Sequence, residues 1–152
     1  MLDNTVGGGI ATGEARFESL VREAQEEASI PEALVRQNAS SNGAVTYNYI
    51  RESRAGGETG MVQPECEYVY DLELPADVLP KPNDSEVEEF YLWTVEKVQE
   101  EMAKGQFKPN CALIMLDFFI RHGILTKENE DNYEEIKRRL HRQLEFPGPH
   151  RV

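Results

Sequence analysis

The chain has 152 residues, 28 of them acidic and 16 basic, which gives a formal net charge of −12 at pH 7. The length suits one domain with its own core, and the acidic balance argues against nucleic-acid binding, which depends on basic surfaces. We expect no membrane segment, because no apolar run reaches the ~18 residues that a spanning helix needs, and no secretory signal or transit peptide. Cys66 and Cys111 lack zinc or disulfide-framework spacing, so we expect reduced thiols in a cytoplasmic protein.

The first quarter of the chain predicts a loop followed by two helices. Gly7–Gly13 is typical of a loop, and Ala15–Ala28 predicts a helix because its apolar residues recur at helical spacing. These apolar residues are Phe17, Leu20, Val21, Ala24 and Ala28. Ser29 followed by Glu32 predicts a capping box, which would open a short helix that reaches Arg36.

The middle of the chain predicts a turn and three strands. Asn38–Gly43 contains the Asn, Ser and Gly residues that are typical of a turn. Three segments rich in β-branched and aromatic residues follow, separated by a glycine-rich and a proline-rich loop. The predicted strands are Gly43–Ile50, Cys66–Leu74 and Val87–Thr94.

The last third predicts three helices. Their expected ranges are Val95–Lys104, closed by Gly105, then Cys111–Gly123, and finally Tyr133–Leu144. Together with the strands they predict a single α+β domain over residues 1–152, with a small mixed or antiparallel sheet.

Three glutamates gather on the first predicted helix. Glu23, Glu26 and Glu27 stand at i, i+3 and i+4, on the side away from the apolar stripe. Each like-charged pair at this spacing costs a few tenths of a kcal/mol, and a hard cation such as Mg²⁺, which binds carboxylates together with substrate phosphates, would offset that repulsion. Arg22 can orient one carboxylate through its fork of donors. The alternative is an ordinary solvated acidic face.

The wider spacing favours the metal site. Gly8 is followed after five residues by Glu14, and seven residues later by Arg22-Glu23, Ala24, Gln25, Glu26-Glu27, Ala28, Ser29 and Ile30. This pattern closely resembles the Nudix box, G-x5-E-x7-R-E-U-x-E-E-x-G-U, in which U is a bulky aliphatic residue. Two positions depart from it: Ala24 replaces a larger aliphatic residue, and Ser29 replaces a glycine that would serve as a helix C-cap.

The resemblance implies a Nudix-type α/β/α sandwich with a mixed sheet, and hydrolysis of a diphosphate linked to another group. It implies that Glu23, Glu26 and Glu27 bind Mg²⁺ or Mn²⁺, and that the metal activates the attacking water. For the catalytic base we favour Glu26, with Glu27 next, and Arg22 assists. Glu14 is expected to brace the junction of loop and helix through Arg22, so its expected role is structural.

Other residues are candidates for substrate binding. The backbone at Gly8 and Gly9 can approach a ligand closely, and Arg51 and Arg54 could hold phosphate oxygens or be ordinary loop charges. One further acid from outside the box is common in the family. Glu86 and Glu88 are the candidates here, although a solvated strand edge explains them equally well.

Most of the chain shows a narrower likeness. The segments "DNTVGGGIATGE", "TYNYIRESRAGGETGMVQPECEYVYDLELP", "KPNDSEVEEFYLWT" and "FKPNCALIMLDFFIRHG" resemble the Nudix domain of the thiamine pyrophosphokinase-related group of fungi and plants. This resemblance implies removal of the terminal phosphate from thiamine diphosphate, or from its oxidised and antagonist forms, as damage control. A cationic ring system of this kind suits aromatic surroundings. The candidates are Tyr47, Tyr49, Tyr68, Tyr70 and Trp93, and a place in the core or on the surface of the sheet is the simpler explanation for each.

Two alternatives stay open at this point. The chain could be a Nudix hydrolase of another small-molecule diphosphate, such as a nucleoside diphosphate derivative. It could also be a catalytically silent fragment or binding module, because only Met1–Val6 precedes the box, whereas a Nudix domain normally has strands there. We therefore expect the N-terminal strands of the fold to be missing. The sequence does not predict an oligomeric state.

Overall fold

The computed structural model describes residues 1–50 and 59–145, so Arg51 and Arg54 lie outside the described residues. The elements in chain order are α1 Arg16–Ala28, α2 Glu32–Asn38, β1 Ala39–Ile50, β2 Val62–Leu72, α3 Val95–Ala103, α4 Pro109–Arg121 and α5 Tyr133–Leu140. They belong to two compact units. Unit 1 comprises Met1–Asn42 and Tyr70–Lys108, and unit 2 comprises Gly43–Val69 and Pro109–Val152.

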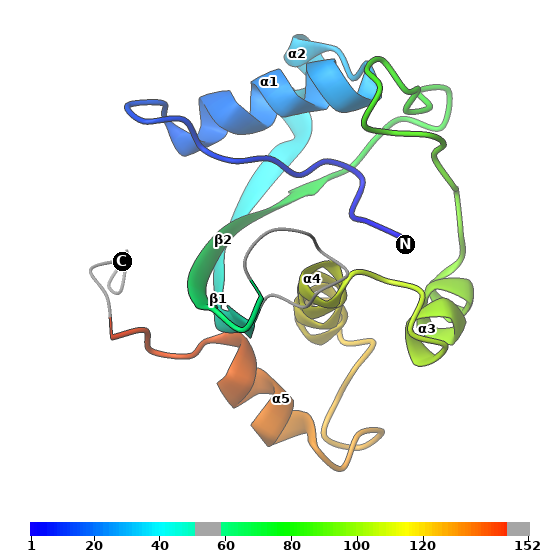
Figure 1. Ribbon diagram of the computed structural model, residues 1–152. Helices are drawn as coiled ribbons and strands as arrows, with labels where there is room; N and C mark the ends of the chain where they lie inside the picture. The colour runs from blue at the N-terminus through cyan, green and yellow to red at the C-terminus, as the bar shows by residue number, and fades with distance from the viewer. Residues whose placement is uncertain (51–58, 146–152) are drawn as a thin grey trace. The chain divides into compact units, whose positions relative to one another are not determined.

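The core of unit 1 lies under α1 and α2, which are neighbours in Figure 1. The predicted apolar stripe of α1 is buried there, with Ala24 and Ala28 fully inaccessible. Val35 of α2 and Ile30 between the helices complete this buried cluster. Leu72, Leu74 and Phe90, which come from a distant part of the sequence, pack against it. The face of α1 opposite this core is therefore available for polar side chains.

The end of α1 differs from the prediction. Ser29 adopts a left-handed conformation, with φ of 54° and ψ of 27°, and closes the helix by donating its backbone N–H to Ala24 and Gln25. The start of α2 has no side-chain cap, so the predicted capping box is wrong. Ser29 instead takes the conformation that favours glycine at this position of the motif.

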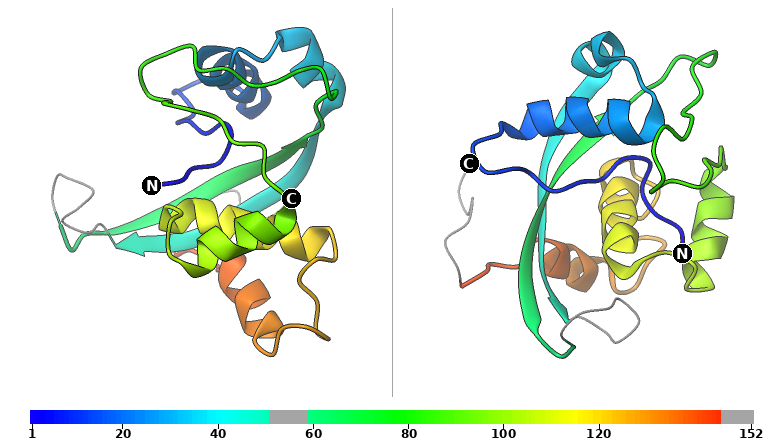
Figure 2. Two further views of the ribbon diagram at one scale, coloured as in Figure 1. Left: turned by 90° about the vertical axis from the view of Figure 1, so that its right-hand side faces the viewer. Right: turned by 45° about the horizontal axis from the view of Figure 1, so that its top comes forward.

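β1 and β2 form the sheet of the described residues and run side by side in both views of Figure 2. The side chain of Asn38 donates to the carbonyl of Glu73, and that of Ser40 to the carbonyl of Asp71. The partner number falls as the first number rises, so the pair is antiparallel. The turn predicted at Asn38–Gly43 is wrong, because pairing with β2 overrides the local preference of these residues.

The strand predicted at Val87–Thr94 is absent from the described structure. An extended segment becomes a strand only when its N–H and C=O groups pair with a neighbour, and in residues 1–50 and 59–145 the sheet consists of β1 and β2. Here the rings of Tyr91 and Trp93 pack on each other at 5.1 Å. Leu92 is 90% exposed, which fits a segment that no strand covers.

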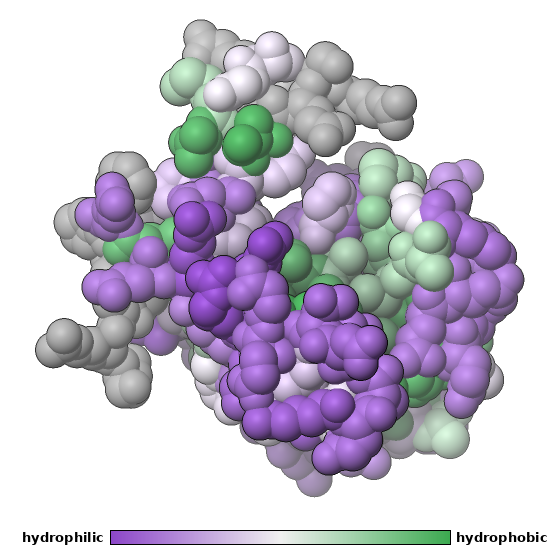
Figure 3. All heavy atoms as spheres, turned by 90° about the horizontal axis from the view of Figure 1, so that it is seen from below, coloured by the Kyte–Doolittle hydropathy of each residue, from purple (hydrophilic) through white to green (hydrophobic). Residues whose placement is uncertain are grey.

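The helices of unit 2 surround their own core. Val45, Tyr47 and Val69 of the strands and Leu140 of α5 are buried together. α5 ends at Leu140, earlier than predicted. Beyond it the backbone N–H of Arg142 donates to the carbonyl of Thr46 in β1 and not to a carbonyl of the helix. Charged side chains cover the outer face of α5, and hydrophilic residues dominate the view from below in Figure 3.

The predicted class is confirmed: the chain is mixed α+β, and its pattern is consistent with a Nudix fold. The sheet of the described residues is an antiparallel pair, which is one of the two arrangements that the sequence left open; the resemblance had implied a mixed sheet. Among these residues we find no helix with the length and apolar character needed to cross a bilayer.

Candidate functional site

The glycine-rich loop folds back over α1. The backbone N–H of Gly7 donates to Glu27 Oε2 at 3.0 Å, and that of Ala11 donates to Glu14 Oε2 at 3.3 Å. At Gly8 the backbone lies so close to Glu23 that a methyl group built there would overlap the Glu23 carboxylate. The loop therefore contacts the predicted acidic residues directly, and the first glycine of the motif is required for space.

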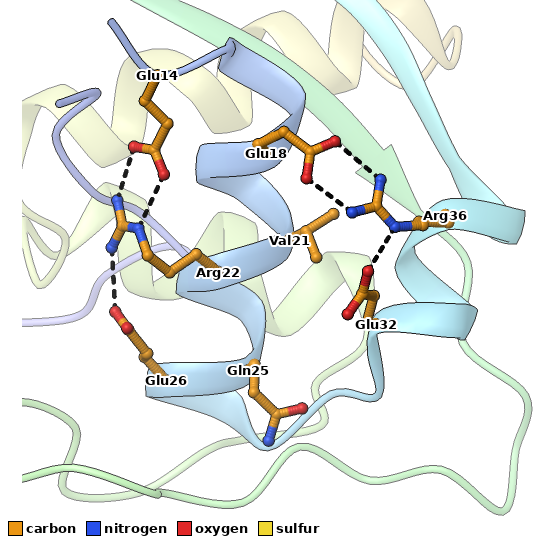
Figure 4. Close-up of a pocket in the computed structure, with 8 residues that line it drawn as sticks. All are labelled: Glu14, Glu18, Val21, Arg22, Gln25, Glu26, Glu32 and Arg36. Atoms are coloured by element: carbon orange, nitrogen blue, oxygen red, sulfur yellow. Dashed lines mark hydrogen bonds and ion pairs between the residues drawn. The ribbon is translucent and has the colours of Figure 1, made fainter. Parts of the chain in front are cut away.

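Arg22 is the centre of the acidic cluster (Figure 4). Its Nε and Nη2 donate to the two oxygens of Glu14, both at 3.0 Å, which forms a bidentate pair. Its Nη1 donates to Glu23 Oε1 at 2.9 Å and to Glu26 Oε2 at 3.0 Å. Because a guanidinium presents its donors in a rigid fork, one side chain fixes three carboxylates relative to one another.

This arrangement shifts the pKa values of Glu14 and Arg22. The hydrogen bonds from Arg22 lower the pKa of Glu14 below its ordinary value. The hydrogen bonds to Glu14 and Glu26 raise the pKa of Arg22 above its ordinary value, so it stays charged. Glu14 lies against Arg22 and the loop, which is the arrangement expected for a residue that braces the junction.

Glu27 has a different environment from Glu14. Partial burial raises its pKa, and the N–H of Gly7 opposes that rise. The negative charges of Glu23, Asp84 and Asp3 raise the pKa further. Glu27 therefore lies where negative charge accumulates, which is the environment that a divalent cation would relieve.

Two acids from outside the motif, Asp84 and Asp3, act on Glu27 in this way, and Asp84 lies two residues before the predicted candidate Glu86. Glu86 and Glu88 are exposed, and the N–H of Glu86 donates to Asp84 Oδ1 at 2.9 Å. Their predicted role as extra acids stays a prediction. Sequence reasoning missed Asp84 because its approach to α1 depends on how the segment after β2 packs.

A pocket of about 400 Å³ lies on the face of α1 and α2. One side carries Glu14, Arg22 and Glu26, as Figure 4 shows. On the other side Arg36 binds Glu18 through two hydrogen bonds of 2.9 and 2.7 Å, and Glu32 through one of 2.7 Å. Arg22 and Arg36, each bonded to carboxylates, thus lie on opposite sides of one pocket. Of the two, Arg22 belongs to the motif and Arg36 does not.

The predicted aromatic residues are divided between the two units. Tyr47 is buried in the core of unit 2, where its hydroxyl bonds to Glu65 and Glu67. Burial raises the pKa of Tyr47. In unit 1 the ring of Tyr70 packs against Phe17 at 5.9 Å, and that of Trp93 against Tyr91. At Tyr47 the alternative of a core aromatic is therefore the better explanation.

The donor set of α1 fits a hard divalent cation, because carboxylate oxygens are the ligands that Mg²⁺ and Mn²⁺ prefer. In the described part of the chain, however, no three His, Cys, Asp or Glu side chains converge as a ready-made metal site. Glu23 and Glu26 both bond to Arg22, and Glu27 bonds to Gly7. Arg22 bonds to one oxygen of Glu23 and to one oxygen of Glu26, so the second oxygen of each carboxylate could bind a cation while Arg22 holds the side chain.

The space at Gly8 gives a direct test of the loop's role. We expect Gly8→Ala to displace the Glu23 carboxylate and to weaken Mn²⁺ binding by about 10-fold or more, as do changes in residues that orient metal ligands. Titration with Mn²⁺, followed by electron paramagnetic resonance, measures this affinity. Gly9→Ala is the matched control, because a methyl group there meets no atom within 4 Å. Equal Mn²⁺ affinity in both variants would show that the Gly8 contact has no part in the site.

Comparison with known proteins agrees with this geometry. Residues 2–112 match the NUDIX domain family. The chain is 42% identical over 151 residues to the uncharacterized protein YJR142W of Saccharomyces cerevisiae, covering 97% of this chain and 44% of that protein. It is 37% identical over 143 residues to Nudix hydrolase 20, chloroplastic, and 36% over 140 residues to Nudix hydrolase 24, chloroplastic, both of Arabidopsis thaliana. These two matches cover 91% of this chain and 36% of each relative.

The chain therefore belongs to the NUDIX domain family, and the prediction of a Nudix hydrolase is confirmed at the level of the family. Enzymes of this family generally use divalent metals and act on small-molecule diphosphates. The chain spans less than half the length of each of the three relatives named above.

Proposed function

We propose that residues 1–152 contribute a single Nudix domain that hydrolyses a diphosphate with Mg²⁺ or Mn²⁺ bound by Glu23, Glu26 and Glu27. The observation that carries this proposal is the cluster on α1, where Arg22 holds Glu14, Glu23 and Glu26 while the glycine loop contacts Glu23 and Glu27. Carboxylates of this kind can bind a divalent cation, and a cation beside a closely approaching backbone suits a negatively charged diphosphate.

In the proposed reaction, water adds to a phosphorus atom of the diphosphate, and the bond from that phosphorus to the bridging oxygen breaks. A bound divalent cation would neutralise phosphate charge and lower the pKa of the attacking water. Glu26 accepts the proton of this water, and Glu27 is the second candidate for that role. Arg22 holds the carboxylates in register, and the backbone at Gly8 and Gly9 faces the substrate.

For the substrate we propose thiamine diphosphate, preferentially its oxidised or antagonist forms, cleaved to the monophosphate as a damage-control reaction. The support is the likeness of four segments, spread over most of the chain, to the thiamine pyrophosphokinase-related group. Arg51 and Arg54 are the proposed phosphate contacts. A cytoplasmic location stays a prediction, and the two plant relatives are named as chloroplastic.

A substrate panel tests this proposal. With Mg²⁺ present, we expect the protein to release phosphate from oxothiamine diphosphate faster than from thiamine diphosphate, and to lose this activity when EDTA removes the metal. Cleavage of a nucleoside diphosphate derivative alone would keep the Nudix chemistry and overturn the thiamine substrate. If no compound is cleaved and Mg²⁺ does not raise the melting temperature, the chain has no assembled metal site and is catalytically silent, because a ligand that binds the folded state stabilises it.

A further inference from the structure

The catalytic glutamates proposed above lie on the last turn of α1, the part of a helix that frays most readily. An α-helix leaves its last four carbonyl groups without partners inside the helix. In α1 these groups belong to the four residues from Gln25 to Ala28, and Glu26 and Glu27 are two of the four. Of the four, the carbonyl of Gln25 accepts the N–H of the closing residue Ser29 at 3.3 Å. The order of this turn therefore decides how well the two carboxylates are positioned.

A distant segment supplies partners for three of these four carbonyls. The N–H of Lys81 donates to the carbonyl of Ala28 at 2.9 Å, and the N–H of Asn83 to that of Glu27 at 3.3 Å. The side-chain amide of Asn83 donates to the carbonyl of Gln25 at 3.1 Å. Figure 1 shows the segment that follows β2 beside the C-terminal end of α1.

The segment Lys81–Asn83 is well suited to hold the turn. Pro80 and Pro82 flank Lys81, and each proline fixes its own φ angle, which stiffens the backbone. The two hydrogen bonds of Asn83 reach the carbonyls of Gln25 and Glu27, so they hold the peptide groups immediately before and immediately after the Glu26–Glu27 pair. Both candidates for the proposed base, Glu26 and Glu27, project from the backbone between these two peptide groups.

The sequence of the turn increases the need for this support. Ser29 closes α1 in the left-handed conformation, which costs a non-glycine residue about 1–2 kcal/mol. The motif usually places glycine there, so this chain closes the helix at a less favourable residue. The three external hydrogen bonds offset that weakness.

We infer that Asn83 is a positioning residue for the metal-binding turn of α1, acting through the carbonyls of Gln25 and Glu27. This inference rests on the proposed function for its catalytic consequence but not for its structural part. The side chain of Asn83 holds the turn, and the carboxylates of Glu26 and Glu27 depend on that turn for their geometry.

Asn83→Ala tests the inference, with Asn129→Ala as the matched control. Asn129 is also exposed, and its side-chain amide donates to a single main-chain carbonyl, that of Ile124, at 2.9 Å. Hydrogen exchange of the amides of residues 28–30, measured without metal, reports the order of the turn. Mn²⁺ affinity and the separate kcat and KM values report its consequence for the site.

We expect Asn83→Ala to speed exchange in this turn and to weaken Mn²⁺ binding by about twofold to tenfold, the value of one neutral hydrogen bond. We expect kcat to fall by a similar factor with little change in KM, and Asn129→Ala to leave all these values unchanged. Adding Ser29→Gly should restore part of the Mn²⁺ affinity, because glycine adopts the left-handed conformation without strain.

Unchanged exchange in the turn of Asn83→Ala would overturn the inference, as would faster exchange with unchanged Mn²⁺ affinity. If the unmodified protein binds no Mn²⁺ and cleaves no diphosphate, the proposed function fails. In that case, faster exchange in Asn83→Ala would still support the structural part of the inference, that Asn83 orders the last turn of α1. Unchanged exchange would overturn the structural part as well.

Discussion

Replacing Glu26 with glutamine is expected to lower kcat for diphosphate hydrolysis by roughly 10²–10⁴-fold, the usual loss when a general base is removed. Glutamine has nearly the same shape and can still accept a hydrogen bond from Arg22, so the fold of α1 should be preserved. It cannot take a proton from water. Three glutamates of the motif bond to Arg22. Of these, Glu26 has the most accessible side chain, at 54% exposed against 19% for Glu14 and 15% for Glu23, so solvent can reach it.

Glu32→Gln is the control for this variant. Glu32 lines the same pocket and bonds to an arginine, Arg36, in the same way as Glu26 bonds to Arg22. It lies on α2, outside the motif, and we expect its kcat to equal that of the unmodified protein. Measuring initial rates at saturating Mg²⁺ and substrate compares the two variants directly.

The same measurement separates the two candidate bases. If Glu26→Gln keeps more than a tenth of the activity while Glu27→Gln loses almost all of it, the base is Glu27. The environment of Glu27, partly buried with a raised pKa, makes this a real alternative. Full activity in both variants would remove the glutamates of this turn from the role of base.

The sequence predicted the contacts within α1 better than it predicted the sheet. Fixed spacing within one helix determines that Arg22, Glu23 and Glu26 share a face, and the structure brings these side chains together. The approach of Asn83 and Asp84 to α1 could not be read in this way, because more than 50 residues separate them from the helix. Contacts of this kind depend on packing and carry no local signal.

Local propensity failed in both directions. Asn38–Gly43 has the composition of a turn but largely joins β1, since β2 offers its residues hydrogen-bond partners. Val87–Thr94 has the composition of a strand but pairs with no strand of the described structure. A strand forms only where a neighbouring strand pairs with it, which local sequence does not reveal. The apolar stripe of α1, in contrast, follows from the spacing of residues within the helix itself.

The second large effect is expected at Arg22. Arg22→Lys keeps the positive charge but loses the fork of donors, so one ammonium group cannot bond to both oxygens of Glu14 and also reach Glu23 and Glu26. We expect kcat to fall by roughly 10–100-fold, as do changes in residues that orient metal ligands. Mn²⁺ affinity should change less than kcat, because the local charge is the same.

Arg36→Lys provides the control, since Arg36 also forms a bidentate pair with one glutamate and a further bond with another, at the opposite side of the same pocket. Both variants should lose hydrogen bonds between segments of unit 1, from Arg22 to Glu14 or from Arg36 to Glu18, and both should lower the melting temperature. Only Arg22→Lys should lower kcat, because its carboxylate partners include Glu23 and Glu26 of the motif, whereas those of Arg36 do not. An equal loss of kcat in both variants would mean that Arg22 acts through general stability, and unchanged kcat in Arg22→Lys would mean that the carboxylates hold their geometry without its fork.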